Sequence, residues 1–338
     1  MNRFKDEMDN IKQHFEEKNW IYDFNEKGIV FHKKSAFLPD GEIVISPSKR
    51  VINDSFAVVF NQIFDITSKF AHDKIGNCKI LNPINIYSAY KNNSFVSTGL
   101  EYYYNYLYNN GQISSDKSII LQPSIRFKLD FFNKALYGNN NKYDFSSISF
   151  NNLSIVHFEE NLDIIKNIEN VLDYLSMLKI HASRVNFVVE TTVRQKENNV
   201  SYIAIKFFVD NLEVGDILFF NAKDRYLVEY GFGFERLLSR ILNKKYCDLF
   251  IGNNKYDIRA LLASNFLTSL CMFDNKSCNH GAKSKINMVL KTFDENSDIM
   301  DLSLVYENYL YWNQILQNTT YNVNFDNVAK KYIKLLRR

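Results

Sequence analysis

The chain has 338 residues, of which 46% are hydrophobic and 23% are charged, and its net charge is +3. This length suits two packed domains and the apolar content is ample for a core, while the balanced charge neither identifies a nucleic-acid-binding protein nor excludes a local basic face. Four prolines and 11 glycines argue against a disordered chain.

The first hundred residues mix helix and strand signals. Hydrophobic residues three to four positions apart predict an amphipathic helix over 3–19, and a second helix is predicted over 55–71. Between them, Gly28 to Phe31 and Glu42 to Ile45 have the pattern of short strands. A tyrosine-rich helix is expected from Glu101 to Leu107.

The next segment predicts two strands around a polar loop. Ser118 to Leu129 is strand-like, and Pro123 within it indicates an edge position or a bulge. Residues 136–146 are rich in asparagine and predict a loop, after which Ser149 to Phe158 fits a returning strand. Glu159 to Lys179 has the clearest helical pattern, with two glutamates expected in its first turn.

The segment up to residue 242 continues with strands and closes on a helix. Strands are predicted at Val185 to Val189, at Tyr202 to Val209, and as a pair at Ile217 to Phe220 and Tyr226 to Glu229. A glycine turn at 231–233 is expected to lead into a helix from Phe234 to Leu242.

The character of the sequence changes near residues 240–250, where strand signals stop. We therefore predict an α+β domain with an antiparallel sheet over 1–245 and an all-helical domain over 246–338. Four helices are expected in the second domain, at 257–270, 281–292, 303–317 and 326–337.

The sequence gives no sign of a membrane segment or a metal centre. No run approaches about 20 apolar residues, and the charged N-terminal segment lacks the apolar region of a signal peptide, so we expect a cytoplasmic protein. The cysteines lack a CxxC pair, which favours a reducing compartment. Cys271, Cys278 and His280 match no standard zinc spacing, so we identify no metal ligands.

Two arginines stand where an anion could be held. Arg236 follows Gly231 and Gly233 in the first turn of a predicted helix, where the helix end and the guanidinium together attract negative charge. Arg126 ends a predicted strand beside a polar loop, which suits a phosphate clamp. Taken singly, Arg236 is equally well explained as a surface arginine, and Arg126 is better explained as one.

In this order, on strand–loop–strand and strand–turn–helix elements, the two arginines resemble motifs 2 and 3 of class II aminoacyl-tRNA synthetases. Further segments resemble the catalytic part of alanyl-tRNA synthetase. They correspond to its motif 1, to its central strands and to the segment that leads into its helical domain. These segments are 47–54, 213–221, 228–236, 248–250, 258–260 and 264–281.

The resemblance implies an antiparallel class II sheet, ATP and Mg²⁺ as cofactors, and a role for each matched residue. Arg126 would contact the α-phosphate and the substrate carboxylate, and Arg236, with Gly231 and Gly233, would bind the rest of ATP. Glu229 replaces the family's aspartate that binds the substrate ammonium, and Asp216 replaces an asparagine beside it. Phe158, or else His157, falls where an aromatic ring stacks on adenine.

Departures from the family pattern leave the substrate and acceptor open. The loop after Arg126 lacks the family's polar residues, a Gly-Pro-Cys loop is absent, and lysines replace an arginine-rich helix. The leading hypothesis is a ligase that forms an aminoacyl-adenylate and charges tRNA, with phosphate contacts from Lys283, Lys285 and Lys291. The alternatives are transfer to a carrier protein or small molecule, and a non-catalytic paralogue. The sequence does not indicate an oligomeric state.

Overall fold

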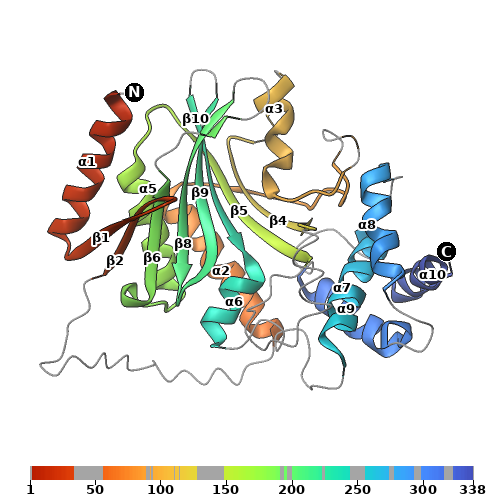
Figure 1. The fold of residues 1–338 in the computed structure, drawn as a ribbon. Helices are drawn as coiled ribbons and strands as arrows, with labels where there is room; N and C mark the ends of the chain where they lie inside the picture. Colours follow the sequence, from red (N-terminus) through yellow and green to blue (C-terminus); the bar gives the residue numbers. More distant parts are fainter. Residues whose placement is uncertain are drawn as a thin grey trace, which may run out of the picture.

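We describe the protein from a computed structural model (Figure 1). The described residues are 2–33, 56–88, 92, 94–109, 111–113, 115–127, 148–190, 194–195, 200–222, 225–243, 256–273, 278–292, 298–315 and 323–337. The predicted strand at 42–45, the loop at 136–146, the motif 1 segment at 47–54 and the domain boundary at 245 lie outside them.

One ten-stranded sheet organises the first part of the chain, in the order β1-β2-β6-β8-β9-β10-β5-β4-β3 with β7 paired to β8. Its strands are β1 (Trp20–Asn25), β2 (Gly28–Lys33), β3 (Lys79–Leu81), β4 (Lys117–Ile125), β5 (Ser149–Glu159), β6 (Val185–Glu190), β7 (Arg194–Gln195), β8 (Ser201–Val209), β9 (Leu212–Ala222) and β10 (Arg225–Gly233). All neighbouring pairs are antiparallel except β3 with β4.

Helices flank the sheet and then replace it. Those of the first part are α1 (Asn2–Glu17), α2 (Phe56–Lys74), η1 (Gly99–Tyr103), α3 (Tyr104–Asn109), α5 (Ile164–Met177), η2 (Ala182–Arg184) and α6 (Phe234–Leu242). After α6 the described chain is helical only: α7 (Ile258–Phe273), α8 (His280–Leu290), η5 (Asp298–Met300), α9 (Leu302–Ile315) and α10 (Phe325–Leu336). The predicted fold class, an antiparallel sheet flanked by helices and followed by a helical part, is confirmed.

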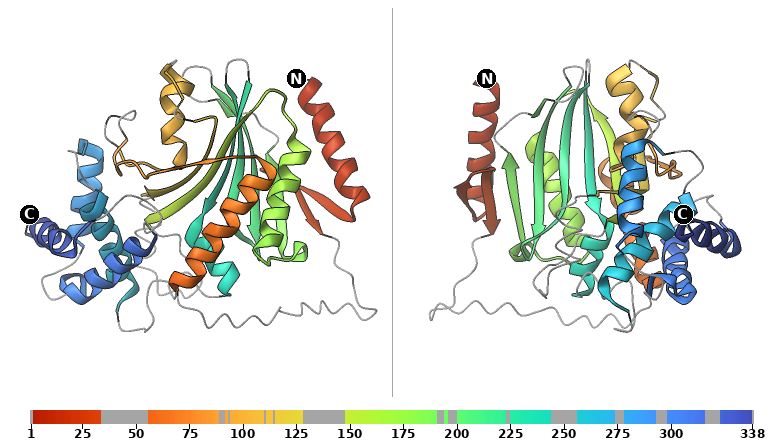
Figure 2. Two further views of the ribbon diagram at one scale, coloured as in Figure 1. Left: turned by 180° about the vertical axis from the view of Figure 1, so that it is seen from behind. Right: turned by 45° about the vertical axis from the view of Figure 1, so that its right-hand side comes forward.

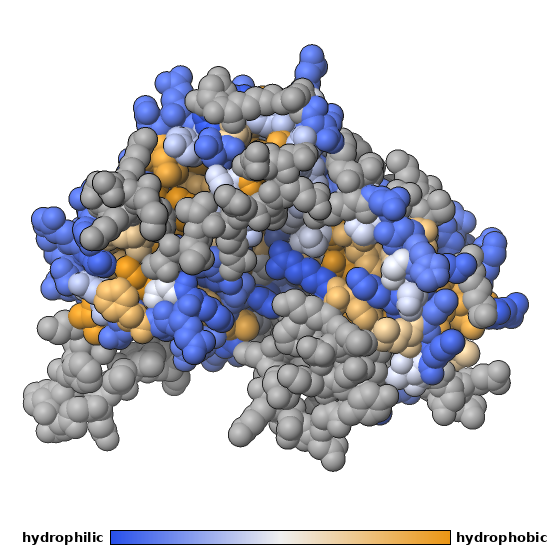
Figure 3. All heavy atoms as spheres, turned by 45° about the horizontal axis from the view of Figure 1, so that its top comes forward, coloured by the Kyte–Doolittle hydropathy of each residue, from blue (hydrophilic) through white to orange (hydrophobic). Residues whose placement is uncertain are grey.

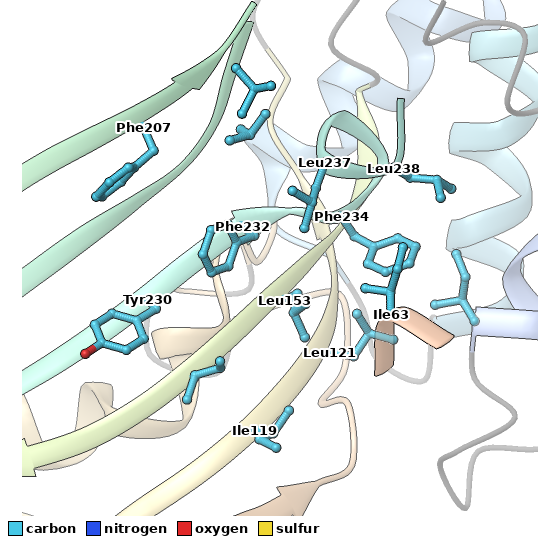
Figure 4. Packing of buried hydrophobic residues seen from close by; sticks show 14 of the residues in the cluster. Ile63, Ile119, Leu121, Leu153, Phe207, Tyr230, Phe232, Phe234, Leu237 and Leu238 are labelled. Atoms are coloured by element: carbon cyan, nitrogen blue, oxygen red, sulfur yellow. The ribbon is translucent and has the colours of Figure 1, made fainter. Parts of the chain in front are cut away.

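The two faces of the sheet bury different partners, because side chains alternate along each strand. On one face, alternate residues such as Leu153, Tyr230 and Phe232 join the large core beneath α2 and α5, and Phe234 continues it onto Ile63 of α2 (Figure 4). On the other face, Val156, Phe220 and Leu227 join a smaller core beneath η1 and α3. The candidate site lies on this second face.

The C-terminal helices gather beside one end of the sheet, on the side away from α1, in each of the views in Figures 1 and 2. Phe266 of α7 packs edge-on against Phe95, with ring centroids 5.9 Å apart, and Ser149 of β5 donates a hydrogen bond to Ser269 at 2.7 Å. None of the described helices is both long and apolar enough to cross a membrane.

Two details of the sequence prediction were wrong. Helix α5 begins at Ile164 and is capped by Asp163, whereas Glu159 ends strand β5 and pairs with Tyr226. Glycines 231 and 233 lie in strand β10 and make no turn, so the strand runs directly into α6. In both places strand pairing extends past the point where the hydrophobic alternation becomes hard to read.

Candidate active site

The smaller-core face of the sheet changes from apolar to polar along its central strands. At the end nearest α6, successive inward positions are occupied by six polar side chains, which we call the polar patch: Gln122, Ser124, Asn152, Ser154, Asp216 and Glu229. All but Asp216 are at most 5% exposed. A central sheet position would ordinarily hold an aliphatic residue, so this clustering indicates a binding function.

Two carboxyl groups form the centre of the patch. The Oε1 atom of Glu229 accepts hydrogen bonds from Ser154 Oγ at 2.5 Å and from Thr98 Oγ1 at 3.3 Å. Asp216 sits on the neighbouring strand opposite Gly231, and a Cβ atom at Gly231 would lie 2.9 Å from Asp216 Oδ1 and 3.5 Å from Glu229 Cδ. Gly231 therefore leaves the space into which both carboxyl groups project.

The surroundings of this pair disfavour its full ionisation. Burial raises the pKa of Glu229 to about 7, with repulsion from Asp216 adding to the effect and the two hydroxyl donors opposing it. Burial likewise raises the pKa of Asp216 to about 6, partly offset by attraction to Arg126. A cation placed between the two groups would offset both the cost of burying the carboxylates and their mutual repulsion.

Arg126 lies at the rim of the patch, directly after β4. Its Nε donates to the carbonyl oxygen of Ser97 at 3.1 Å, and its guanidinium lies 5.1 Å from the ring centroid of Phe150. The side chain is exposed, and its positive charge acts to lower the pKa of both Glu229 and Asp216. An exposed cation anchored beside two carboxyl groups can hold an anion that is joined to an ammonium group.

Arg236 stands at the same end of the sheet, in the first turn of α6. Its Nη1 donates to the carbonyl oxygen of Glu213 at the start of β9, at 3.1 Å. A Cβ atom at Gly233 would make only ordinary van der Waals contact with Arg236 Cδ, at 3.5 Å, so the arginine side chain lies close to this end of the strand. The structure thus brings five predicted residues, Arg126, Asp216, Glu229, Gly231 and Arg236, to one end of the sheet.

The segment before α3 covers the patch and was not recognised from the sequence. The backbone N–H of Gly99 donates to Asn152 Oδ1 at 2.8 Å, and a Cβ atom at Gly99 would lie 2.6 Å from Ser154 Oγ. Thr98 caps η1 and also reaches Glu229. One sequence signal could have located the patch: the polar residues Asn152 and Ser154 occupy alternate positions of β5, between the apolar residues Phe150 and Val156.

Phe158 lies on the same face as the polar patch, two residues from Val156, which pairs with Glu229, but far from Arg126. It lies eight residues from Phe150 along β5, which is roughly 26 Å at the usual rise of a strand. The guanidinium of Arg225 lies 3.9 Å from its ring centroid, and Tyr106 packs against it with centroids 5.4 Å apart. His157 points to the opposite face, where it contacts Tyr230 and Glu159. The aromatic ring that accompanies Arg126 is Phe150.

The three lysines predicted to contact tRNA all lie at or just after α8, in different surroundings. Lys283 and Lys291 are exposed. The Nζ of Lys285 lies 5.9 Å from the ring centroids of both Phe95 and Phe127, the residue next to Arg126. Figure 3 shows hydrophilic residues near the middle of one face, between the sheet and these helices. Lys285 thus carries positive charge toward the rim of the patch.

The described residues do not form a metal centre. No group of three or more histidine, cysteine, aspartate or glutamate side chains within them is placed to hold a metal ion. Cys271 is buried in α7, Cys278 precedes α8 and His280 is exposed at the start of that helix.

Comparison with known proteins adds a distant likeness to solved structures. Neither a protein-family model nor a curated protein matches the chain. Among solved structures, a pyrrolysyl tRNA synthetase from Desulfitobacterium hafniense is similar at 12% sequence identity and a TM-score of 0.35, over 55% of this chain and 67% of that one. We draw no functional conclusion from a likeness of this size.

Proposed function

We propose that the protein is an aminoacyl-tRNA-synthetase-like ligase, which activates an amino acid with ATP and passes the aminoacyl group to an acceptor, with tRNA as the leading candidate. The observation that carries the proposal is the arrangement at one end of the sheet. The buried carboxyl group of Glu229 and the partly buried one of Asp216 lie beside the exposed cation Arg126, with Arg236 at the same end. An amino acid carries complementary charges, an ammonium and a carboxylate.

The chemistry follows from these charges. The ammonium of the amino acid would be held by Glu229 and Asp216, which places its carboxylate toward Arg126. A carboxylate oxygen then attacks the α-phosphorus of ATP, the bond to the β-phosphate oxygen breaks, and pyrophosphate leaves. Negative charge on the α-phosphate grows during the attack, and a fixed guanidinium stabilises it without reorganisation.

Arg236 and Mg²⁺ would stabilise the negative charge of the leaving pyrophosphate. Arg236 is held against the start of β9, at the edge of the patch. Mg²⁺ is commonly bound by phosphate oxygens and water, with few protein ligands. When bound with ATP, the ion would neutralise phosphate charge.

The resemblance to alanyl-tRNA synthetase suggests a small amino acid, and Lys285 near the rim suggests a polyanionic acceptor that approaches from the side of α8. We propose alanine, glycine and serine as the first substrates to test and tRNA as the first acceptor. If adenylate forms but total tRNA is not charged, the acceptor is a carrier protein or a small molecule.

The test is ATP–pyrophosphate exchange with each common amino acid, comparing Arg126→Ala and Arg236→Ala with a matched control, Arg225→Ala. Arg225 lies on the same strand as Glu229 but at its other end. We expect exchange to fall by roughly 100-fold or more in the first two variants, with folding intact and the control near wild type. Equal activity in all three variants contradicts the site. No exchange with any amino acid, together with no ATP binding by calorimetry, contradicts the function.

A further inference from the structure

Strand β5 begins with three residues that reach different parts of the molecule. Phe150 lies on the patch face, beneath the guanidinium of Arg126. Ser149 and Asn151 point to the opposite face, because side chains alternate along a strand. There Ser149 donates to Ser269 of α7. The start of β5 is therefore connected both to the site and to the C-terminal helices.

Asn151 is bound to a buried carboxylate. The backbone N–H of Asn151 donates to Glu235 Oε1 and Oε2, at 2.8 and 3.0 Å, and its Nδ2 donates to Oε1 at 2.9 Å. Glu235 is 1% exposed and stands in the first turn of α6, immediately before Arg236. This links the strand beneath Arg126 to the helix that carries Arg236.

A third element joins the same carboxylate. The hydroxyl of Tyr311 in α9 donates to Glu235 Oε1. Three donors from two separate elements thus converge on one side chain, and one of those elements belongs to the C-terminal helices. A purely apolar contact would fill this space at lower cost, because burial of a carboxyl group is expensive unless its partners are well placed.

We propose that Glu235 is a positioning residue, which holds the start of β5, the first turn of α6 and helix α9 together so that the two arginines keep their relative places. The inference rests on the proposed function for what the arginines do, but the coupling itself is a property of the fold. It requires that the position of α9 affects the stability of the first turn of α6. Burial raises the pKa of Glu235 to about 7, which the donors from Tyr311 and Asn151 oppose.

The experiment uses Tyr311→Phe in the full chain, which removes one hydroxyl and leaves the ring in place. Its matched control is Tyr309→Phe on the same helix, because the Tyr309 hydroxyl donates to the carbonyl of Val323 within the C-terminal helices. Hydrogen exchange of backbone amides is measured in α6 and at the start of β5, along with kcat and KM in pyrophosphate exchange.

We expect Tyr311→Phe to speed amide exchange in the first turn of α6 and in residues 149–151 roughly tenfold, which corresponds to the loss of one hydrogen bond to a charged group. We expect kcat to fall with little change in the KM for the amino acid, and Tyr309→Phe to do neither. Faster exchange confined to α9, or identical behaviour of the two variants, overturns the proposal. If the wild type shows neither pyrophosphate exchange nor ATP binding, the proposed function fails, and the amide exchange rates still decide the coupling.

Discussion

The carboxyl group of Glu229 is 1% exposed and its pKa is raised to about 7, so its ionised form is held in the fold at a cost. An ammonium ligand would lower that cost, and the loss of the carboxylate should weaken amino acid binding in particular. For Glu229→Gln we expect the KM for the amino acid to rise roughly 30-fold or more, with the KM for ATP changed little. Glu159→Gln on the opposite face is the control. Equal rises in both KM values would mean that Glu229 does not bind the ammonium.

The same raised pKa values predict how stability depends on pH. Glu229 and Asp216 have ordinary values of 4.5 and 3.8, and both are higher in the folded protein, so the folded state binds more protons between about pH 4 and 7. The pair therefore favours the folded state fully below pH 4, and this contribution is lost as pH rises through about 6 to 7.

Substitution of one of the two acids should remove part of the stability loss that occurs as the pH rises. We expect Glu229→Gln to be more stable than wild type at pH 8, by about 1–3 kcal/mol, and the difference to vanish near pH 4. Chemical denaturation at both pH values measures it. A difference that is the same at pH 4 and pH 8 would show that the substitution acts through packing and not through charge.

Strand β10 and its neighbour β9 depend on two glycines with different surroundings. A Cβ atom at Gly215 would lie 2.4 Å from the carbonyl oxygen of Gly231, which is backbone and cannot turn aside, whereas one at Gly231 would meet the Asp216 side chain. We expect Gly215→Ala to destabilise the fold by about 1–3 kcal/mol and Gly231→Ala to destabilise it less but to weaken amino acid binding more. Denaturation midpoints and KM values measure the two effects. The reverse order of destabilisation would contradict this account of the two strands.

Elements with strong local patterns were predictable from the sequence. Helix α6 was predicted with its exact bounds, Phe234 to Leu242, and the antiparallel order followed from short strands separated by short connections. Strands β1 and β3 were missed, since β1 lies at the sheet edge with a mostly exposed side and β3 has only three residues. The position of Phe158 relative to Arg126 could not be read from the sequence. Distance along a strand decides which residues share a site, and the loop after Arg126 gave no register for β5.

The whole molecule joins the sheet to the C-terminal helices through buried polar groups as well as apolar ones. Ser149 contacts Ser269, Glu235 contacts Tyr311, and Phe95 packs on Phe266. A domain division at 245 and 246 stays a prediction from the sequence, since those residues lie outside the described ranges. The contacts nevertheless indicate what separation of the two parts would do.

A fragment of residues 1–245 would take from Glu235, Ser149 and Phe95 one described partner each, since Tyr311, Ser269 and Phe266 lie in the removed helices. Lost packing and solvated polar groups together should outweigh the few kcal/mol by which a domain is usually stable. We expect the fragment to melt well below the full chain, or not to fold. Addition of a separate 246–338 fragment should restore the higher melting temperature if the two parts recognise each other. A 1–245 fragment that melts at the temperature of the full chain would show that the sheet domain is independent, and that Glu235 does not need α9 for its place.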